Sequence, residues 1–260
     1  MILKNVSIAN SQLTVKINRS NKGDSMLLPS IKSTKETNLA RQVTLIYGRP
    51  KIGKSTFCSY YDHAVFFATE PGLNHLEVFK VNINNWHTFL EACGEIAGGK
   101  HEFKTIIIDT IDNLLVYCSD YVCKENDISH PADLPHGKGW SLITAEFTRA
   151  MVKLYGLGYG VVLVGHTKQE EVETKTKKYS RFTIDISGKN QNVILNGMDL
   201  ILFMDSEMKD GVEVGVLRTK PSQYYEAGDK SKLLPESIYY PLDNPKVAYD
   251  AVIKAFNVAK

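Results

Sequence analysis

Two kinds of apolar pattern alternate along the chain from residue 43 onward. Short, nearly continuous apolar runs are typical of strands buried on both faces of a parallel sheet, whereas apolar residues that recur every three or four positions are typical of helices. Because the two patterns alternate, the sequence predicts an α/β fold, a mostly parallel sheet with helices on both faces. Strands are expected at residues 43–47, 64–69, 104–110, 161–166 and 199–205, and helices at 54–61, 86–98, 111–126, 140–158 and 246–256.

The segments outside this pattern set the expected domain limits. The turn sequence KDG at 209–211 predicts that residues 212–220 return as the partner of the preceding strand, which gives a C-terminal β-hairpin. The polar N-terminal region contains one strand-like alternation, at Leu13, Val15 and Ile17. We therefore expect an N-terminal arm at residues 1–40, a core domain at 41–230 and a C-terminal extension with a helix at 231–260.

The composition excludes few classes of protein. A chain of 260 residues with 43% apolar and 23% charged residues is ordinary for a globular protein, and a net charge of +2 gives no argument for nucleic acid by itself. No apolar run approaches the length of a membrane span, and no signal-peptide pattern is visible, so no membrane partner is expected. The cysteines (58, 93, 118 and 123) are expected to be free thiols in a reducing cytoplasm, that of the host if a phage encodes the chain.

A glycine-rich loop follows the strand expected at residues 43–47. Residues 48–55, GRPKIGKS, fit G-x-x-x-x-G-K-[ST] at every position. The glycines let successive N–H groups turn inward as an anion site, and the next helix adds its positive N-terminal end. Lys54 is expected to reach the β- and γ-phosphates of ATP, and the Ser55 hydroxyl to bind Mg²⁺. The predicted nucleotide-binding residues are Gly48, Arg49, Pro50, Lys51, Ile52, Gly53, Lys54, Ser55 and Thr56.

Two carboxylates at strand ends are candidates for the rest of the site. Asp109 follows Lys54 by 55 residues and is expected to hold Mg²⁺ directly or through water, although it can also cap the next helix. Thr110 stands where AAA+ and ABC ATPases normally have the catalytic Glu, which counts against both classes. Glu70 follows the second strand. Because ligand groups gather at the carboxyl ends of parallel strands, Glu70 is expected to polarise the attacking water, unless it is a solvated turn carboxylate.

Six segments carry a family resemblance: GRPKIGKST, ATEPGL, TIIIDT, HGKGW, VVLVGHTK and LRTKPSQYYEAGD occur in this order over roughly residues 43–230. They resemble the RecA-like recombinase core, in which the catalytic Glu follows the second strand instead of the Walker-B Asp. The chain looks most like the compact phage proteins of the Sak type, which anneal single strands, and their ATP-binding relatives. The resemblance implies an Mg²⁺–ATP-dependent protein that binds single-stranded DNA and self-assembles as a ring or filament, with a single-strand-binding protein as a further candidate partner.

The resemblance also implies roles for residues beyond the phosphate loop. His166 stands where RecA-like proteins place a γ-phosphate sensor, usually glutamine, but it can equally be a strand-end residue with partners of its own. The segments after the third helix and after His166 correspond to two DNA-facing loops, where Tyr179 and Phe182 offer rings for stacking. The alternative is a solvated mobile loop, because glutamates lie among the basic residues. The predicted DNA-binding residues are Lys138, Lys168, Lys175, Lys177, Lys178 and Arg181.

Arg218 and Lys220 alternate on the expected last hairpin strand and therefore project to one side. In RecA-like filaments a basic pair on an equivalent strand reaches the nucleotide of the neighbouring subunit, where it would neutralise charge as the phosphoryl group leaves. The resemblance thus implies that Arg218 and Lys220, with Glu70, Lys54 and His166, are catalytic. The alternative for the basic pair is an exposed sheet edge protected by charge.

The expected function is annealing or strand pairing of single-stranded DNA by an ATPase whose sites lie between subunits. A helicase or packaging motor is an alternative, although no second phosphate loop is present. A small-molecule kinase would need an acceptor pocket and usually an arginine-rich lid. A nucleotide-binding regulator with little turnover is a further alternative.

Overall fold

The computed structural model describes residue 29, residues 31–186 and residues 188–258. The chain divides into two units, Met1–Lys35 and Glu36–Lys260, and the architecture below is that of the second. The N-terminal strand expected at Leu13, Val15 and Ile17 lies outside the described residues. Among the described residues, no helix has the length and apolar content needed to span a bilayer.

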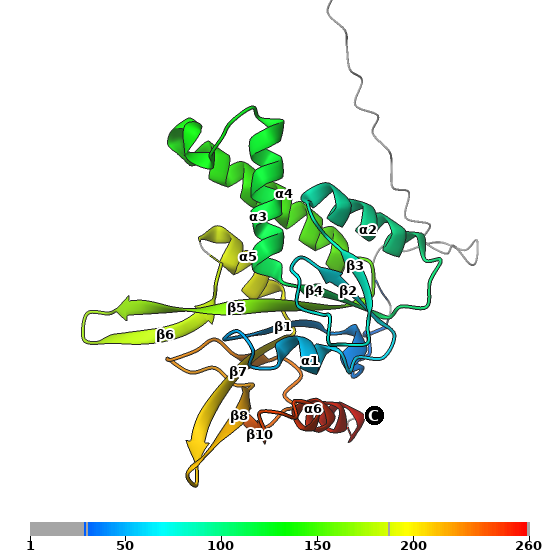
Figure 1. Ribbon diagram of the computed structural model, residues 1–260, viewed down its shortest axis with the longest axis vertical. Coiled ribbons are helices and arrows are strands. Elements are labelled where there is room, and N and C mark those ends of the chain that lie inside the picture. Colours follow the sequence, from blue (N-terminus) through cyan, green and yellow to red (C-terminus); the bar gives the residue numbers. More distant parts are fainter. Residues whose placement is uncertain (1–28, 30, 187, 259–260) are drawn as a thin grey trace, which may run out of the picture. The chain divides into compact units, whose positions relative to one another are not determined.

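One sheet runs through the second unit (Figure 1). Its strands follow the order β3 (Phe79–Asn82), β2 (Ala64–Ala68), β4 (Thr105–Asp109), β5 (Gly160–Glu173), β1 (Val43–Gly48), β7 (Leu200–Lys209), β8 (Val212–Arg218) and β10 (Ser237–Tyr240). The strands from β3 to β7 pair in parallel, and β8 and β10 add antiparallel pairs. β6 (Lys178–Ile184) pairs antiparallel with the outer part of β5, and the short β9 (Gly228–Asp229) pairs with β7.

Helices cover both faces of this sheet, as Figure 1 shows. One face carries α2 (Trp86–Gly98), α3 (Ile111–Glu125), α4 (Lys138–Tyr155) and α5 (Lys189–Gly197), and the other carries α1 (Lys54–Cys58) and α6 (Lys246–Val258). Leu45 and Tyr47 on β1 belong to the first core, and Ile46 between them belongs to the second. This double burial explains the continuous apolar run of the strand, because a strand with helices on both faces has no solvent-facing positions.

The expected fold class is confirmed. The chain forms an α/β core with a mostly parallel sheet, helices on both faces and a β7–β8 hairpin toward the C-terminus. The strand that leads into the phosphate loop, β1, lies in the middle of the sheet between β5 and β7. The loop and the ends of β2, β4 and β5 therefore meet at one edge.

Two local predictions are wrong. The charged stretch at residues 168–182 is not a loop, because β5 continues to Glu173 and pairs with β6 in a long antiparallel hairpin. None of the side chains from 168 to 182 is buried, and polar residues occupy its half-exposed side as well as its exposed side, so the apolar alternation that marks a half-buried strand is weak. In addition, β8 ends at Arg218, so Lys220 lies beyond the strand. β8 is also flanked by β7 and β10 and is not a sheet edge.

Candidate nucleotide site

The phosphate loop links β1 to α1 and contains glycines that the surrounding structure requires. A Cβ at Gly48 would lie 2.3 Å from the backbone oxygen of Met204 on the adjacent β7. Gly53 has φ +101°, and a Cβ there would lie 2.6 Å from Cγ of Pro245. An L side chain at either position would therefore force the backbone to move. Packing against β7 and against the start of α6 therefore requires glycine at both positions. The phosphate ligand that this loop suits is a second reason for glycine there.

Lys54 is the first residue of α1 and is only 6% exposed. Its Nζ donates to the backbone oxygens of Gly48 at 2.9 Å and Arg49 at 3.0 Å. Burial lowers the pKa of the Lys54 ammonium, and the carboxylates of Asp109, Asp112 and Glu70 oppose this shift. The ammonium is held inside the loop by neutral carbonyls, so its charge is available to pair with a phosphate.

Ser55 and Asp109 form the candidate metal pair. The Ser55 Oγ donates to Asp109 Oδ2 at 2.6 Å, and Asp109 is 3% exposed at the end of β4. Burial raises the pKa of the Asp109 carboxyl, whereas the hydrogen bond from Ser55 favours the ionised form. A hydroxyl beside one carboxylate suits Mg²⁺, which keeps several waters and shares its other positions with phosphates. This set therefore fits the metal, although the described residues contain no cluster of three or more metal-binding side chains.

Glu70 lies just beyond the end of β2, at the same edge of the sheet. It lines a polar cavity of about 340 Å³, and its Oε2 accepts a hydrogen bond from Asn113 Nδ2 at 3.1 Å. The Glu70 carboxylate raises the pKa values of both Lys54 and Asp109, so its charge acts on both groups. The sheet thus brings together the four residues to which the sequence assigned phosphate, metal and water.

His166 lies opposite Gly48 across the β1–β5 ladder. Its Nδ1 is 2.8 Å from Asp112 Oδ2, and its backbone N–H donates to Asp112 Oδ1 at 3.3 Å. The sequence did not place Asp112 or Asn113 among the site residues, although both lie in the first turn after the Asp109 strand. Only the strand order shows that this turn faces His166 and Glu70, because those residues are distant in sequence.

The expected basic pair is held by acidic groups of the same chain. Arg218 forms an ion pair with Glu207, and its Nη1 lies 3.2 Å from Ser237 Oγ. The Lys220 Nζ lies 3.2 Å from Asp229 Oδ2. These partners of Arg218 and Lys220 lie outside the phosphate loop of the same chain. A role at a neighbour's nucleotide therefore stays a prediction, and it would require these ion pairs to open.

The predicted DNA-binding residues are spread over the hairpin and the start of α4. Lys175 and Lys177 are exposed in the turn between β5 and β6, and Lys138 is exposed at the first position of α4. The other basic side chains have acidic partners within the same chain. Lys178 pairs with Glu171, Arg181 with Glu226, and Lys168 lies 4.0 Å from Asp185.

Comparisons with known proteins assign the class. The model of the AAA domain family matches residues 40–231, and the chain belongs to this family of P-loop ATPases. It is similar to the SPbeta prophage-derived uncharacterized protein YorG of Bacillus subtilis (strain 168), with 25% identity over 178 residues, 66% of this chain and 53% of that protein. The chain thus spans about half the length of this relative. It also resembles the flagellar accessory protein FlaH from Methanocaldococcus jannaschii, with a TM-score of 0.41, 10% identity and coverage of 78% and 85% of the two chains.

The family assignment corrects one argument from the sequence. Thr110 after the Walker-B Asp was expected to count against an AAA-type ATPase, yet the family match spans this residue. In the structure, Thr110 is the N-cap residue of α3, and its N–H donates to Thr69 Oγ1 at 2.7 Å. The position after Asp109 therefore serves to join β4 to β2. The absence of a carboxylate there does not exclude this family.

Proposed function

We propose that this chain is a RecA-like, Mg²⁺–ATP-dependent ATPase that binds single-stranded DNA and promotes its annealing or pairing as a homo-oligomer. One observation carries the proposal. A buried lysine, a serine–aspartate pair and a separate carboxylate on the neighbouring strand meet at the carboxyl edge of the sheet. In this arrangement the group that activates water lies on the strand next to the metal carboxylate, which is the RecA-like arrangement.

Each side chain of the site has a distinct task in this proposal. A bound Mg²⁺ would neutralise negative charge on the phosphates. Lys54 binds the β- and γ-phosphates, and Ser55 and Asp109 hold the metal. Glu70 accepts a hydrogen bond from the attacking water and orients it, and Asn113 fixes the Glu70 carboxylate from α3. His166, held by Asp112, is the candidate group that senses the γ-phosphate.

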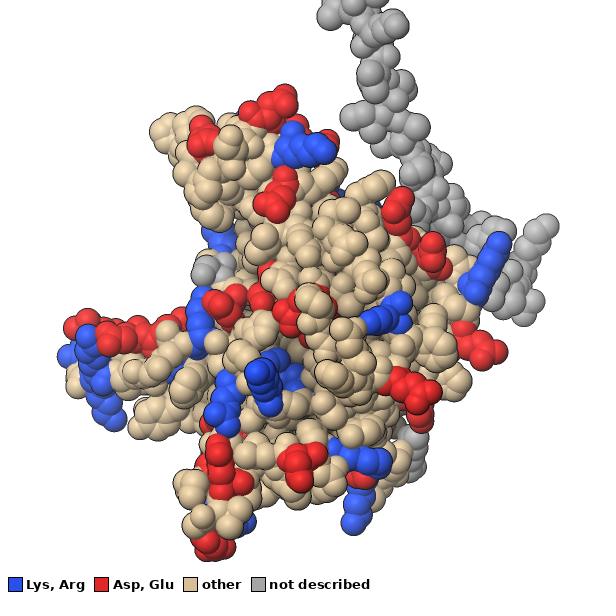
Figure 2. Space-filling view, viewed as in Figure 1, with Lys and Arg blue, Asp and Glu red and all other residues tan. Residues whose placement is uncertain are grey.

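The β5–β6 hairpin supports the DNA part of the proposal. It extends beyond the helical layers in Figure 1, and Figure 2 shows acidic side chains along one edge and basic side chains near its tip. The exposed Lys175 and Lys177 at the tip can contact phosphates, while Glu171 and the other glutamates limit how strongly the hairpin attracts a strand. The relative YorG is prophage-derived, which supports a phage origin for this chain.

ATP turnover measured with and without single-stranded DNA tests the proposal, with negative-stain images of the same samples. We expect hydrolysis that single-stranded DNA stimulates, together with rings or filaments. Stimulation by a metabolite would instead indicate a kinase, and ATP-driven unwinding a motor. Tight nucleotide binding without turnover would indicate a regulator. Each of these three results would contradict the proposed function.

A further inference from the structure

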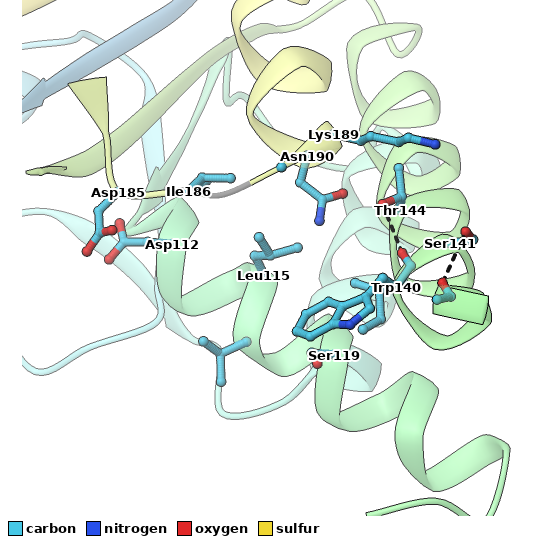
Figure 3. A pocket seen from close by; sticks show the side chains of 14 residues that line it. Asp112, Leu115, Ser119, Trp140, Ser141, Thr144, Asp185, Ile186, Lys189 and Asn190 are labelled. Atoms are coloured by element: carbon cyan, nitrogen blue, oxygen red, sulfur yellow. Dashed lines mark hydrogen bonds between the residues drawn. The ribbon is translucent and has the colours of Figure 1, made fainter. Parts of the chain in front are cut away.

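A second site lies outside the phosphate loop, in a cavity of about 730 Å³ between α3, α4 and the start of α5 (Figure 3). This volume is in the range of cavities that hold small organic ligands. Neither the phosphate loop nor Glu70 contributes to its wall. The residues used below are Leu115, Ile143, Trp140, Ile186, Lys189 and Asn190.

The cavity offers one large aromatic face. Trp140 is 52% exposed at the start of α4, whereas the other tryptophan, Trp86, is 1% exposed in the core. The His130 and Trp140 rings form a T-shaped pair with centroids 5.7 Å apart, which restricts the indole on one side. Leu115 and the buried Ile143 and Ile186 complete an apolar wall. A flat ring placed there would cover apolar surface of the indole that is open to water.

The cavity also contains an amide without a partner. Asn190 is 8% exposed, and its Oδ1 is buried without a hydrogen bond from any described residue. Figure 3 shows the Asn190 side chain at the start of α5 with its amide nitrogen directed toward Leu115 and Trp140. A buried polar atom without a partner is costly, and a ligand with a matching edge would remove that cost. Since an amide presents a donor and an acceptor side by side, the matching edge also has one of each.

These features select a class of ligand. An acyl chain would leave the Asn190 amide unpaired, and the described residues place no group of three or more His, Cys, Asp or Glu side chains at this cavity to bind a metal ion. A nucleobase has the two properties required, a flat ring for Trp140 and an edge with adjacent donor and acceptor groups for Asn190. The exposed Lys189 and the start of α5 at Gly188, which has no side-chain cap, offer positive potential to an attached phosphate.

We propose that this cavity binds a nucleobase that stacks on Trp140 and is hydrogen-bonded by Asn190. The base can come from a single strand or from a free nucleotide. The proposal relies on the proposed function only for the first of these sources. Asp112 lines the same cavity and also contacts His166, so this one side chain links the cavity to the nucleotide site.

Tryptophan fluorescence tests this site without ATP. Trp140 is the exposed tryptophan, and the buried Trp86 gives a constant background. The probes are oligothymidylate, an abasic strand of equal length and thymidine monophosphate. We expect oligothymidylate to quench Trp140 and the abasic strand to leave it unchanged. In an anisotropy titration with labelled oligothymidylate, which does not need the tryptophan as reporter, Trp140→Ala should weaken binding about 5- to 140-fold, and Trp140→Phe should recover much of the affinity because it retains a ring. Asn190→Ala should weaken binding with the stacking intact.

A matched control is Phe79→Ala, which removes another exposed aromatic side chain, from the edge strand β3. It should bind oligothymidylate like the unaltered protein. Equal quenching by the abasic strand, or unchanged affinity in Trp140→Ala, would overturn the nucleobase site. If neither strand binds, the DNA part of the proposed function fails, and thymidine monophosphate still tests whether the cavity binds a nucleobase. Quenching by this nucleotide then supports the site, and no quenching refutes it.

Discussion

The contact between Asp112 and His166 makes a specific prediction about turnover. Because a carboxylate only accepts hydrogen bonds, Asp112 Oδ2 at 2.8 Å places the proton on His166 Nδ1. The fixed ring then presents its other nitrogen, Nε2, away from Asp112. Asp112→Asn keeps the shape and one acceptor but removes the charged acceptor that orients the ring. We expect kcat for ATP to fall while ATP affinity stays close to normal.

The structure sets the size of this effect. Hydrogen bonds to charged groups contribute about 1.5–3 kcal/mol, but the His166 and Asp112 side chains are 26% and 17% exposed, so solvent screens part of the interaction. Since Asn also retains an acceptor, we expect a loss of about 1–1.5 kcal/mol, or about 5- to 12-fold in kcat. Asp120→Asn, an exposed carboxylate on the same helix, is the control and should have no effect.

A double-mutant cycle with His166→Gln gives the decisive assay. If Asp112 acts by positioning His166, the second substitution should add little, and the two single effects should overlap by about 1 kcal/mol. The assay is steady-state ATP turnover at saturating ATP for the four proteins. If the two single-variant losses instead add within about 0.3 kcal/mol in the double variant, Asp112 does not act by positioning His166.

Three other predictions concern the phosphate loop, the hairpin and the subunit contact. Lys54→Met should abolish ATP binding yet raise the unfolding temperature at pH 7, because burial lowers the pKa of Lys54 and its charge therefore destabilises the folded state. In thermal scans this gain should vanish as pH rises toward the ordinary lysine pKa of 10.5, because Lys54 is then neutral in both states. A lower unfolding temperature of Lys54→Met at pH 7 would contradict the prediction. Charge reversal at Lys175 and Lys177 should reduce the slope of log affinity for single-stranded DNA against log salt concentration by about 0.7 for each phosphate that the hairpin no longer neutralises. The control is Lys100→Glu, and a slope equal to that of the control would show that Lys175 and Lys177 do not touch DNA. If Arg218 acts on a neighbour's ATP, a mixture of the inactive Arg218→Ala and Lys54→Ala proteins should regain turnover, whereas a co-assembled but inactive mixture would contradict action in trans.

The sequence predicted the central fold because its strands are buried on both faces. Strands such as Thr105–Asp109 have no solvent-facing positions, so their apolar character is continuous and easily recognised. The short β3 was missed because all of its residues are exposed, and the β5–β6 hairpin because polar side chains occupy most of both its sides. For these elements the backbone pairing, and not burial, determines the structure.

The phosphate loop was predicted because its chemistry lies in one contiguous segment. The contacts of Glu70 with Asn113 and of His166 with Asp112 depend on strand order, which local patterns do not encode. The cavity at Trp140 was missed for the same reason, since its walls come from three helices that are separate in sequence. The ion pairs of Arg218 and Lys220 likewise come from residues whose proximity only the folded chain establishes.

The most direct test of the account measures ATP turnover by Glu70→Gln in the presence of single-stranded DNA, with ATP affinity determined by equilibrium titration of the same protein. Gln keeps the size of the side chain and can still contact Asn113, but it removes the negative charge that orients water. The account predicts ATP affinity close to normal and a loss of about 10²- to 10⁴-fold in turnover. A folded Glu70→Gln protein that retains more than about a third of the normal turnover would contradict the assignment of Glu70, and with it the proposed RecA-like arrangement of the site.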